Sequence, residues 1–103
     1  MDADPLNAGP VVVLVEVLEV RDPDRYREYQ LAARAQIGPL GGQVLARGAN
    51  AVEGDPPFGT LLLQRWPSAR AFLDWQASGA YAPLKALRQE VATIRLAWMP
   101  LSA

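Results

Sequence analysis

The fold is decided by residues 11–20, which read VVVLVEVLEV, and by the Asp22-Pro23 step that follows them. The run is rich in β-branched valine, so it predicts a β-strand. Aspartate is a common residue at a helix N-cap, and proline is well tolerated at the first helical position. A helix is therefore expected to begin at Pro23, directly after the strand.

The rest of the chain continues this alternation of strands and helices. Apolar side chains at helical spacing predict that the first helix runs from Pro23 to about Ile37. Its stripe consists of Tyr26, Tyr29, Ala33 and Ile37. We then expect strands at 43–47, 60–66 and 93–99, a helix capped by Ser68 and interrupted near 78–79, and a second helical piece at 80–92. The order βαββαβ is typical of an α+β, ferredoxin-like domain with a four-stranded antiparallel sheet and its helices on one face.

Both faces of the predicted sheet are apolar. Alternation along the first strand gives two sets of residues, namely Val12, Leu14, Glu16, Leu18 and Val20, and Val11, Val13, Val15, Val17 and Glu19. We expect the helices to cover the first set and to leave the second set open, together with Leu61, Leu63, Ala97 and Met99. An open apolar face of this kind exceeds what soluble monomers usually tolerate. The sequence therefore predicts a homodimer, sheet against sheet.

The composition excludes most familiar chemistry. The 103 residues carry ten Lys plus Arg and eleven Asp plus Glu, which lacks the basic excess that nucleic acid requires, so no nucleic-acid partner is expected. The absence of cysteine and histidine removes thiolate and imidazole chemistry and most zinc, copper and haem sites. The acidic residues are scattered singly. We therefore expect no metal site and no cofactor.

Two features bear on the location of the protein. The longest apolar run, at 11–15, is much shorter than the roughly 20 residues that cross a bilayer. The start of the chain is acidic, where a signal peptide would be basic. We expect residues 1–10 to be a flexible tail, residues 11–100 to form a single domain, and the protein to be cytoplasmic, with no membrane partner.

Glu16 is a carboxylate inside an apolar strand. Shielded from water, such a group is a candidate general base. Alternatively, Glu16 pairs with Arg65 or Arg95 across the sheet or across a dimer interface, which is the more common role for a buried carboxylate. Glu19 lies three residues further on and is expected on the opposite face, so that the two do not form a carboxylate pair.

Five residues are candidate ligand contacts. Arg47 and Glu53 flank the start of a glycine-rich loop, where an arginine can bind a carboxylate or enolate oxygen through two hydrogen bonds, or can simply hold the loop. Tyr81 and Arg88 are seven residues apart and share a helix face, with Lys85 between them, so they could polarise a carbonyl group. Alternatively, Tyr81 is a core residue beside a solvated basic edge. Trp75 is expected either to line a pocket or to fill the core.

A set of short strings runs through the chain in order: Asp22-Pro23 with Tyr26 and Tyr29, Gly41-Gly42, Arg47-Gly48, Glu53-Gly54, Trp66-Pro67-Ser68, and Trp75-x-x-Ser78-x-x-Tyr81 with Lys85 and Arg88. Over about residues 11–99 this set resembles the domain-of-unknown-function family 1330 of the dimeric α/β-barrel superfamily. The resemblance implies a ferredoxin-like protomer and a dimer whose sheets face each other. It implies no reaction, because the family has no settled activity. Related branches include cofactor-free monooxygenases, lactone isomerases, haem-degrading enzymes and polyketide cyclases, many of which use a histidine that this chain lacks.

These observations predict a small homodimeric protein that binds an apolar, carbonyl- or carboxylate-bearing metabolite between sheet and helices. The expected contacts are Arg47, Glu53, Trp75, Tyr81 and Arg88. An alternative is a cofactor-independent isomerase, cyclase or monooxygenase, in which Glu16 or Tyr81 moves a proton while an arginine stabilises the oxyanion. A second alternative is a structural dimer without a ligand.

Overall fold

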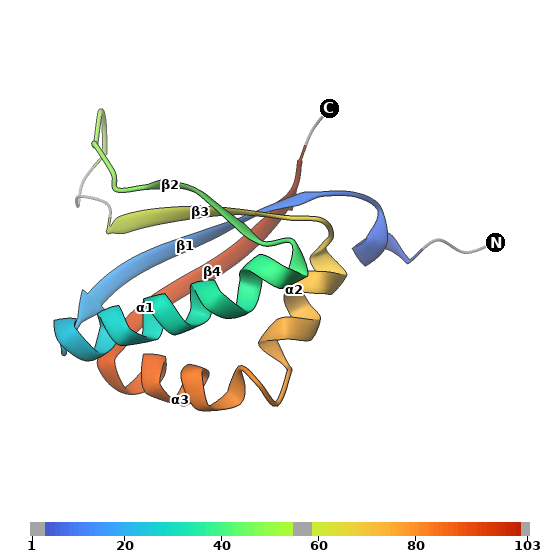
Figure 1. The fold of residues 1–103 in the computed structure, drawn as a ribbon. Coiled ribbons are helices and arrows are strands. Elements are labelled where there is room, and N and C mark those ends of the chain that lie inside the picture. Colours follow the sequence, from blue (N-terminus) through green and yellow to red (C-terminus); the bar gives the residue numbers. More distant parts are fainter. Residues whose placement is uncertain (1–3, 55–58, 102–103) are drawn as a thin grey trace.

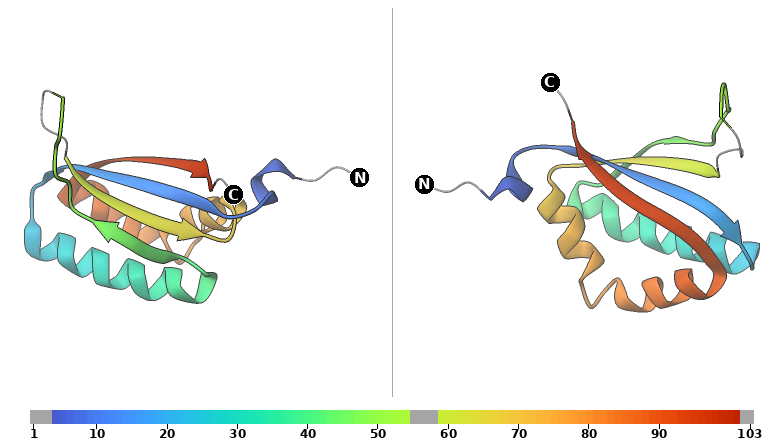
Figure 2. Two further views of the ribbon diagram at one scale, coloured as in Figure 1. Left: turned by 90° about the horizontal axis from the view of Figure 1, so that it is seen from above. Right: turned by 180° about the vertical axis from the view of Figure 1, so that it is seen from behind.

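The computed structural model, which describes residues 4–54 and 59–101, has two layers: a four-stranded antiparallel sheet and a layer of helices. The elements in chain order are η1 (Pro5–Asn7), β1 (Val11–Val20), α1 (Pro23–Ile37), η2 (Gly38–Leu40), β2 (Gln43–Arg47), β3 (Thr60–Trp66), α2 (Ala69–Gln76), α3 (Ala82–Val91) and β4 (Ala92–Pro100). The strand order is β2-β3-β1-β4, and α1, α2 and α3 lie on one side of the sheet (Figures 1 and 2). The predicted ferredoxin-like βαββαβ fold is confirmed.

The helices begin where the sequence places their caps. The Asp22 carboxylate accepts a hydrogen bond of 3.2 Å from the Arg25 amide at the start of α1. The Ser68 hydroxyl does the same for the Ala71 amide at the start of α2, at 3.0 Å. Each bond satisfies an amide that has no partner inside its helix. Local capping chemistry therefore sets the bounds of these elements.

The turn after α1 leaves no room for a side chain at Gly42. A Cβ atom there would lie 3.0 Å from Cβ of Ile37 and 3.1 Å from the Trp66 ring. The preceding Gly41 has φ of 91°, a left-handed conformation that glycine adopts without strain. The two glycines thus allow the chain to enter β2 in direct contact with the end of α1.

The core lies between the sheet and the helices. From β1 it contains Val11, Val13 and Val15, which pack against Trp66 and Phe72. The helices therefore cover the set of β1 residues that we expected to be open, and that part of the prediction is wrong. For β3 and β4 the predicted facing is correct, because Leu62 and Ile94 pack against the core.

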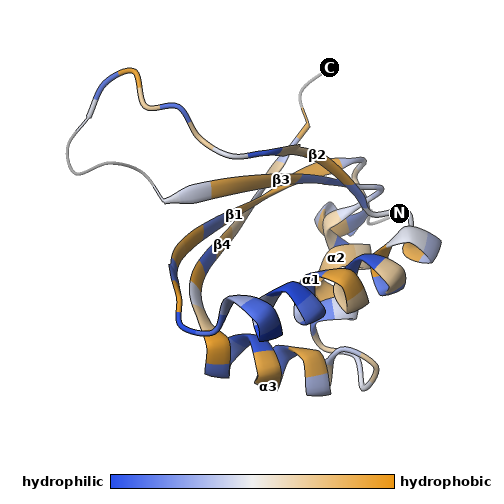
Figure 3. Cartoon of the chain, turned by 60° about the vertical axis from the view of Figure 1, so that its left-hand side comes forward, coloured by the Kyte–Doolittle hydropathy of each residue, from blue (hydrophilic) through white to orange (hydrophobic). Residues whose placement is uncertain are grey.

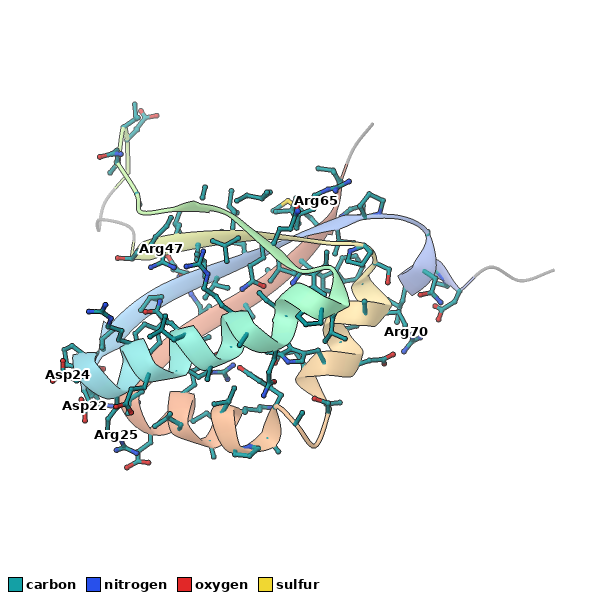
Figure 4. All side chains as sticks on the ribbon, in the orientation of Figure 1. Asp22, Asp24, Arg25, Arg47, Arg65 and Arg70 are labelled. Atoms are coloured by element: carbon teal, nitrogen blue, oxygen red, sulfur yellow. The ribbon has the colours of Figure 1, made fainter. Side chains whose placement is uncertain are left out.

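No helix in residues 4–54 or 59–101 covers the other side of the sheet (Figure 2), and the central strands are rich in hydrophobic residues (Figure 3). Cross-strand neighbours share a face of a sheet. The pairing across β3, β1 and β4 therefore defines the residues of this surface, which we call the open face: Val12, Leu14, Glu16, Leu61, Leu63, Arg65, Arg95, Ala97 and Met99. Figure 4 shows Arg65 on this side and Arg47 on the helix side.

A bulge at Leu18 changes the side of the sheet on which the last residues of β1 lie. The pairing moves from Val17 with Ile94 to Glu19 with Thr93. Glu19 therefore lies on the same side as Glu16, and the predicted opposite placement is wrong. The two carboxylates nevertheless bind different arginines, since Glu19 lies 3.5 Å from Arg21 whereas Glu16 pairs with Arg95.

Residues 4–10, predicted as a flexible tail, carry contacts with the rest of the chain. The Asp4 carboxylate accepts a hydrogen bond of 2.7 Å from Arg70 of α2, and this guanidinium holds the pKa of Asp4 below its ordinary value. Leu6 of η1 packs against the core. The Leu101 amide donates to the Pro10 carbonyl at 3.0 Å. The division of the chain into a tail and one domain stays a prediction.

Candidate ligand-binding site

A cavity of about 50 Å³ lies between the sheet and the helices. We call it the cleft. Val15, Leu62 and Leu96 form its sheet side, and Tyr29, Phe72 and Trp75 belong to its helix side. Small-molecule sites are typically concave and apolar, with a few polar groups that orient the ligand. The cleft has this composition.

Three arginines give the cleft a positive charge. Arg34 reaches it from α1, Arg47 from the end of β2 and Arg88 from α3. None of the aspartates and glutamates that the structure describes lines the cleft, and none forms a salt bridge with these arginines. Arg88 is buried, with 8% of its surface exposed. A buried charge is costly unless it is hydrogen-bonded or meets an opposite charge, so the cleft favours an anionic group.

A chain of hydrogen bonds links Arg88 to the cleft wall. Nη1 of Arg88 donates to the Tyr81 hydroxyl at 2.9 Å, and the Tyr81 and Tyr29 hydroxyl oxygens are 2.6 Å apart. Tyr81 is wholly buried, and its ring packs against Trp75 with 4.1 Å between centroids. Tyr29 lines the cleft, whereas Tyr81 lies behind it. The Tyr29 phenol is therefore part of the cleft wall, and the Tyr81 phenol lies directly behind that wall.

The phenols on α1 are donors at neutral pH. Burial raises the pKa of Tyr29 far above its ordinary value; the adjacent Tyr81 raises it further, and Arg88 opposes the shift. Burial also raises the pKa of Tyr26, against the opposing charges of Arg47 and Arg88. Both hydroxyls therefore keep their protons and do not serve as bases near pH 7.

Two glutamines fix the tryptophan rings. Nε1 of Trp75 donates to Oε1 of Gln36 at 2.9 Å, and Nε2 of Gln36 donates to the Ala80 carbonyl at 2.9 Å. Nε1 of Trp66 donates to Gln64, also at 2.9 Å. Because its N–H group is already bound, Trp75 offers the cleft an apolar ring in a fixed orientation.

The structure brings together four of the five predicted ligand contacts. Arg47, Trp75 and Arg88 line the cleft, and Tyr81 is connected to it through Arg88. Glu53 is exposed in the loop between β2 and β3 and does not line the cleft.

Glu16, the candidate base, lies on the open face, where Nε of Arg95 donates to its carboxylate at 2.7 Å. The sheet separates it from the cleft.

Polar residues of the cleft that were not predicted as contacts include Tyr29, Gln30, Arg34, Gln64 and Gln76. Tyr29 was assigned to the apolar stripe of the first helix. The sequence does contain a signal for Gln64. It lies two residues from both Leu62 and Trp66 on β3, so it is a polar residue on their inward-facing side of the strand.

Within residues 4–54 and 59–101, no group of three or more His, Cys, Asp or Glu side chains is arranged to hold a metal ion. In the same part of the chain, no helix combines the length and apolar character needed to cross a bilayer.

The topology and the single helical layer define a protein of the ferredoxin-like class. The chain belongs to the family described as Domain of unknown function (DUF1330), whose model matches residues 11–100. The predicted resemblance to this family is thereby confirmed. No curated protein matches the sequence.

Three solved structures show how widely the fold is shared. RPA0582, a protein of unknown function from Rhodopseudomonas palustris, is 25% identical, with a TM-score of 0.73 over 92% of this chain and 85% of that chain. A dimeric ferredoxin-like protein of unknown function from Jannaschia sp. CCS1 is 10% identical, with a TM-score of 0.69 over 90% and 100%. SnoaB, a cofactor-independent oxygenase from Streptomyces nogalater, is 14% identical, with a TM-score of 0.59 over 92% and 93%.

Proposed function

We propose that the protein binds a small molecule with an apolar body and a carboxylate or carbonyl group in the cleft between sheet and helices. The observation that carries this proposal is the set of three arginines at a cleft that no described carboxylate lines. Guanidinium groups bind carboxylates through two parallel hydrogen bonds. The aromatic rings of Phe72 and Trp75 supply the apolar contact area for the rest of the ligand.

The roles of the arginines differ with their burial. Arg88 is buried and held by Tyr81, so it is a fixed anchor for the anionic group. Arg47 is exposed at the rim, beside the loop that follows β2, and can close over a bound ligand. This arrangement supports a ligand whose charge lies inside the cleft, next to Arg88.

We also propose that two copies associate through their open faces. The open face combines apolar residues with one internal ion pair, Glu16–Arg95. Burying such a surface is favourable by roughly 25 cal/mol per Å² of apolar area, before the entropy of association is subtracted. The Jannaschia protein is described as dimeric, which supports the formation of a dimer here.

Binding is tested with benzoate as the probe, followed by NMR or calorimetry. Benzoate is expected to bind, its neutral isostere benzamide to bind more weakly, and the cation benzylamine not to bind. Arg47→Met should weaken benzoate binding by about tenfold, the typical value of one charge-assisted hydrogen bond. Arg27→Met is the matched control, because Arg27 is exposed on α1 and lies outside the cleft lining. Equal affinity for benzoate and benzylamine, or no binding of either, would contradict the proposal.

A second candidate function is cofactor-independent catalysis. The shared fold of SnoaB, a cofactor-independent oxygenase, favours it, as do the phenol and guanidinium donors that could stabilise an oxyanion. The raised pKa of Tyr29 argues against this phenol as the base. Oxygen uptake with 1-naphthol as the probe tests this function, and uptake that persists unchanged in the Arg88→Met variant would not come from the cleft. If the protein shows neither benzoate binding nor oxygen uptake, the remaining interpretation is a structural dimer without a ligand.

A further inference from the structure

The hydroxyl group of Tyr81 has a restricted environment. Its oxygen accepts a hydrogen bond from Nη1 of Arg88 at 2.9 Å and lies 2.6 Å from the Tyr29 oxygen. A guanidinium has no acceptor, so the Tyr81 proton cannot point toward Arg88. Tyr81 is 0% exposed, so water does not reach it. Within the described residues, Tyr29 is the one acceptor for this proton, and Tyr81 is therefore the donor in the pair.

This direction leaves the Tyr29 proton available. Tyr29 accepts from Tyr81, and no hydrogen bond from the Tyr29 hydroxyl to another described residue is formed. Tyr29 also lines the cleft, whereas Tyr81 does not. Successive hydrogen bonds polarise one another, so the charge of Arg88 strengthens Tyr29 as a donor through Tyr81.

We infer that Tyr29 is the phenol that contacts the ligand, as the last donor in the chain Arg88 to Tyr81 to Tyr29, and that it binds an acceptor oxygen of a carboxylate or carbonyl group. This inference rests on the proposed binding function. Tyr81, the phenol expected from the sequence, becomes a positioning residue. The cleft should accordingly select against a ligand that presents an amine at this point.

Two isosteric variants separate these roles. Tyr29→Phe removes the proposed ligand contact, and benzoate affinity should fall by about tenfold or more, since a hydrogen bond to a charged group is stronger than one between neutral groups. Tyr81→Phe removes one hydroxyl of the same kind but leaves Tyr29 in the cleft. It removes the polarisation of Tyr29 and the hydrogen bond that holds Arg88, but no ligand contact, so the loss should be smaller than in Tyr29→Phe. A loss in Tyr81→Phe equal to or larger than the loss in Tyr29→Phe would overturn the inference.

A measurement without ligand tests the direction of the chain independently. In the NMR spectrum of the wild-type protein, the Tyr81 hydroxyl proton should exchange slowly with water and show a contact with the Tyr29 ring, whereas the Tyr29 proton should exchange rapidly. Slow exchange at Tyr29 combined with rapid exchange at Tyr81 would overturn the assignment. Failure of the wild-type protein to bind benzoate would overturn the proposed function and the ligand contact, while the exchange rates would still decide which phenol is the donor.

Discussion

Glu16 and Arg95 form an ion pair within an apolar sheet surface. Nε of Arg95 donates to Oε1 of Glu16 at 2.7 Å, and Nη2 donates to the same oxygen. The Glu16 side chain is 14% exposed and that of Arg95 is 69% exposed. This geometry agrees with the interpretation of Glu16 as the partner of a cross-strand arginine. It places the carboxylate on the side of the sheet opposite to the cleft.

Glu16→Gln is therefore expected to leave ligand binding almost unchanged. The sheet lies between the two sites and Glu16 does not line the cleft, so the affinity for benzoate should stay within about twofold, as expected for distant sites without shared partners. Benzoate titration of the variant beside wild type measures the effect, with Arg47→Met as the variant that should lose affinity. A tenfold loss of benzoate affinity in Glu16→Gln would contradict this expectation and would indicate that Glu16 contributes to the candidate site.

Leu14→Glu is expected to dissociate the proposed dimer. Leu14 is central to the open face, between Leu63 and Ala97, and a carboxylate there would be buried without a partner in the associated state. Sedimentation velocity at micromolar concentration should give a dimer for wild type and a monomer for the variant. Leu31→Glu is the control, because Leu31 is 60% exposed on α1 and should leave the dimer intact. A wild-type monomer under these conditions would refute the sheet-to-sheet association.

Gly42→Ala is expected to destabilise the fold by about 1–3 kcal/mol, because overpacking a close contact forces neighbouring groups to move. The new methyl group would lie 3.0 Å from Cβ of Ile37 and 3.1 Å from the Trp66 ring. Urea unfolding measures the difference. Gly38→Ala serves as the matched control: no atom lies within 4 Å of its added methyl group, so its stability should change little. Equal effects in the two variants would contradict the steric explanation.

The Arg25–Glu90 pair should make the melting temperature depend on pH. Nη1 of Arg25 lies 3.0 Å from Oε1 of Glu90, and this hydrogen bond holds the pKa of Glu90 below its ordinary value of 4.5. A lowered folded-state pKa contributes stability above the unfolded-state value, and that contribution is lost as the pH falls through the folded-state value.

The difference in melting temperature between wild type and Glu90→Gln should therefore be small but measurable near neutral pH and should close in acid. It is small because both side chains are exposed. Glu53→Gln is the control, since Glu53 is exposed in a loop and takes part in none of the salt bridges formed by the described residues. A difference for Glu90→Gln that persists unchanged at low pH would contradict the ion-pair explanation.

Local chemistry made much of the fold predictable. The valine-rich strand, the Asp22-Pro23 cap and the glycines after Ile37 act within a few residues, and β1, α1 and β2 begin and end where these signals place them. The facing of β1 is different, because both of its alternating sets are apolar. Which set the helices cover depends on packing between distant elements, and nothing in the alternation of residues 11–20 marks the bulge at Leu18.

The candidate site was predictable in its residue types and not in its connections. Arg47, Trp75 and Arg88 could be selected because cationic and aromatic residues suit a carboxylate with an apolar body. Tyr29 could not be distinguished from its neighbours, since its spacing fits the buried stripe of α1. Its role depends on Tyr81, which is 52 residues further along the chain. Such a contact is created by the tertiary fold alone.

The position of Trp75 gives the protein an intrinsic optical reporter. Its indole ring forms part of the cleft wall and lies 5.6 Å from the ring of Trp66. A guest seated against it would replace solvent and alter the indole emission, so occupancy can be followed by fluorescence without a dye. Trp98, which is partly exposed on β4, adds a background signal that Trp98→Phe would remove. The aromatic wall thus serves both as a contact surface and as an indicator of what rests on it.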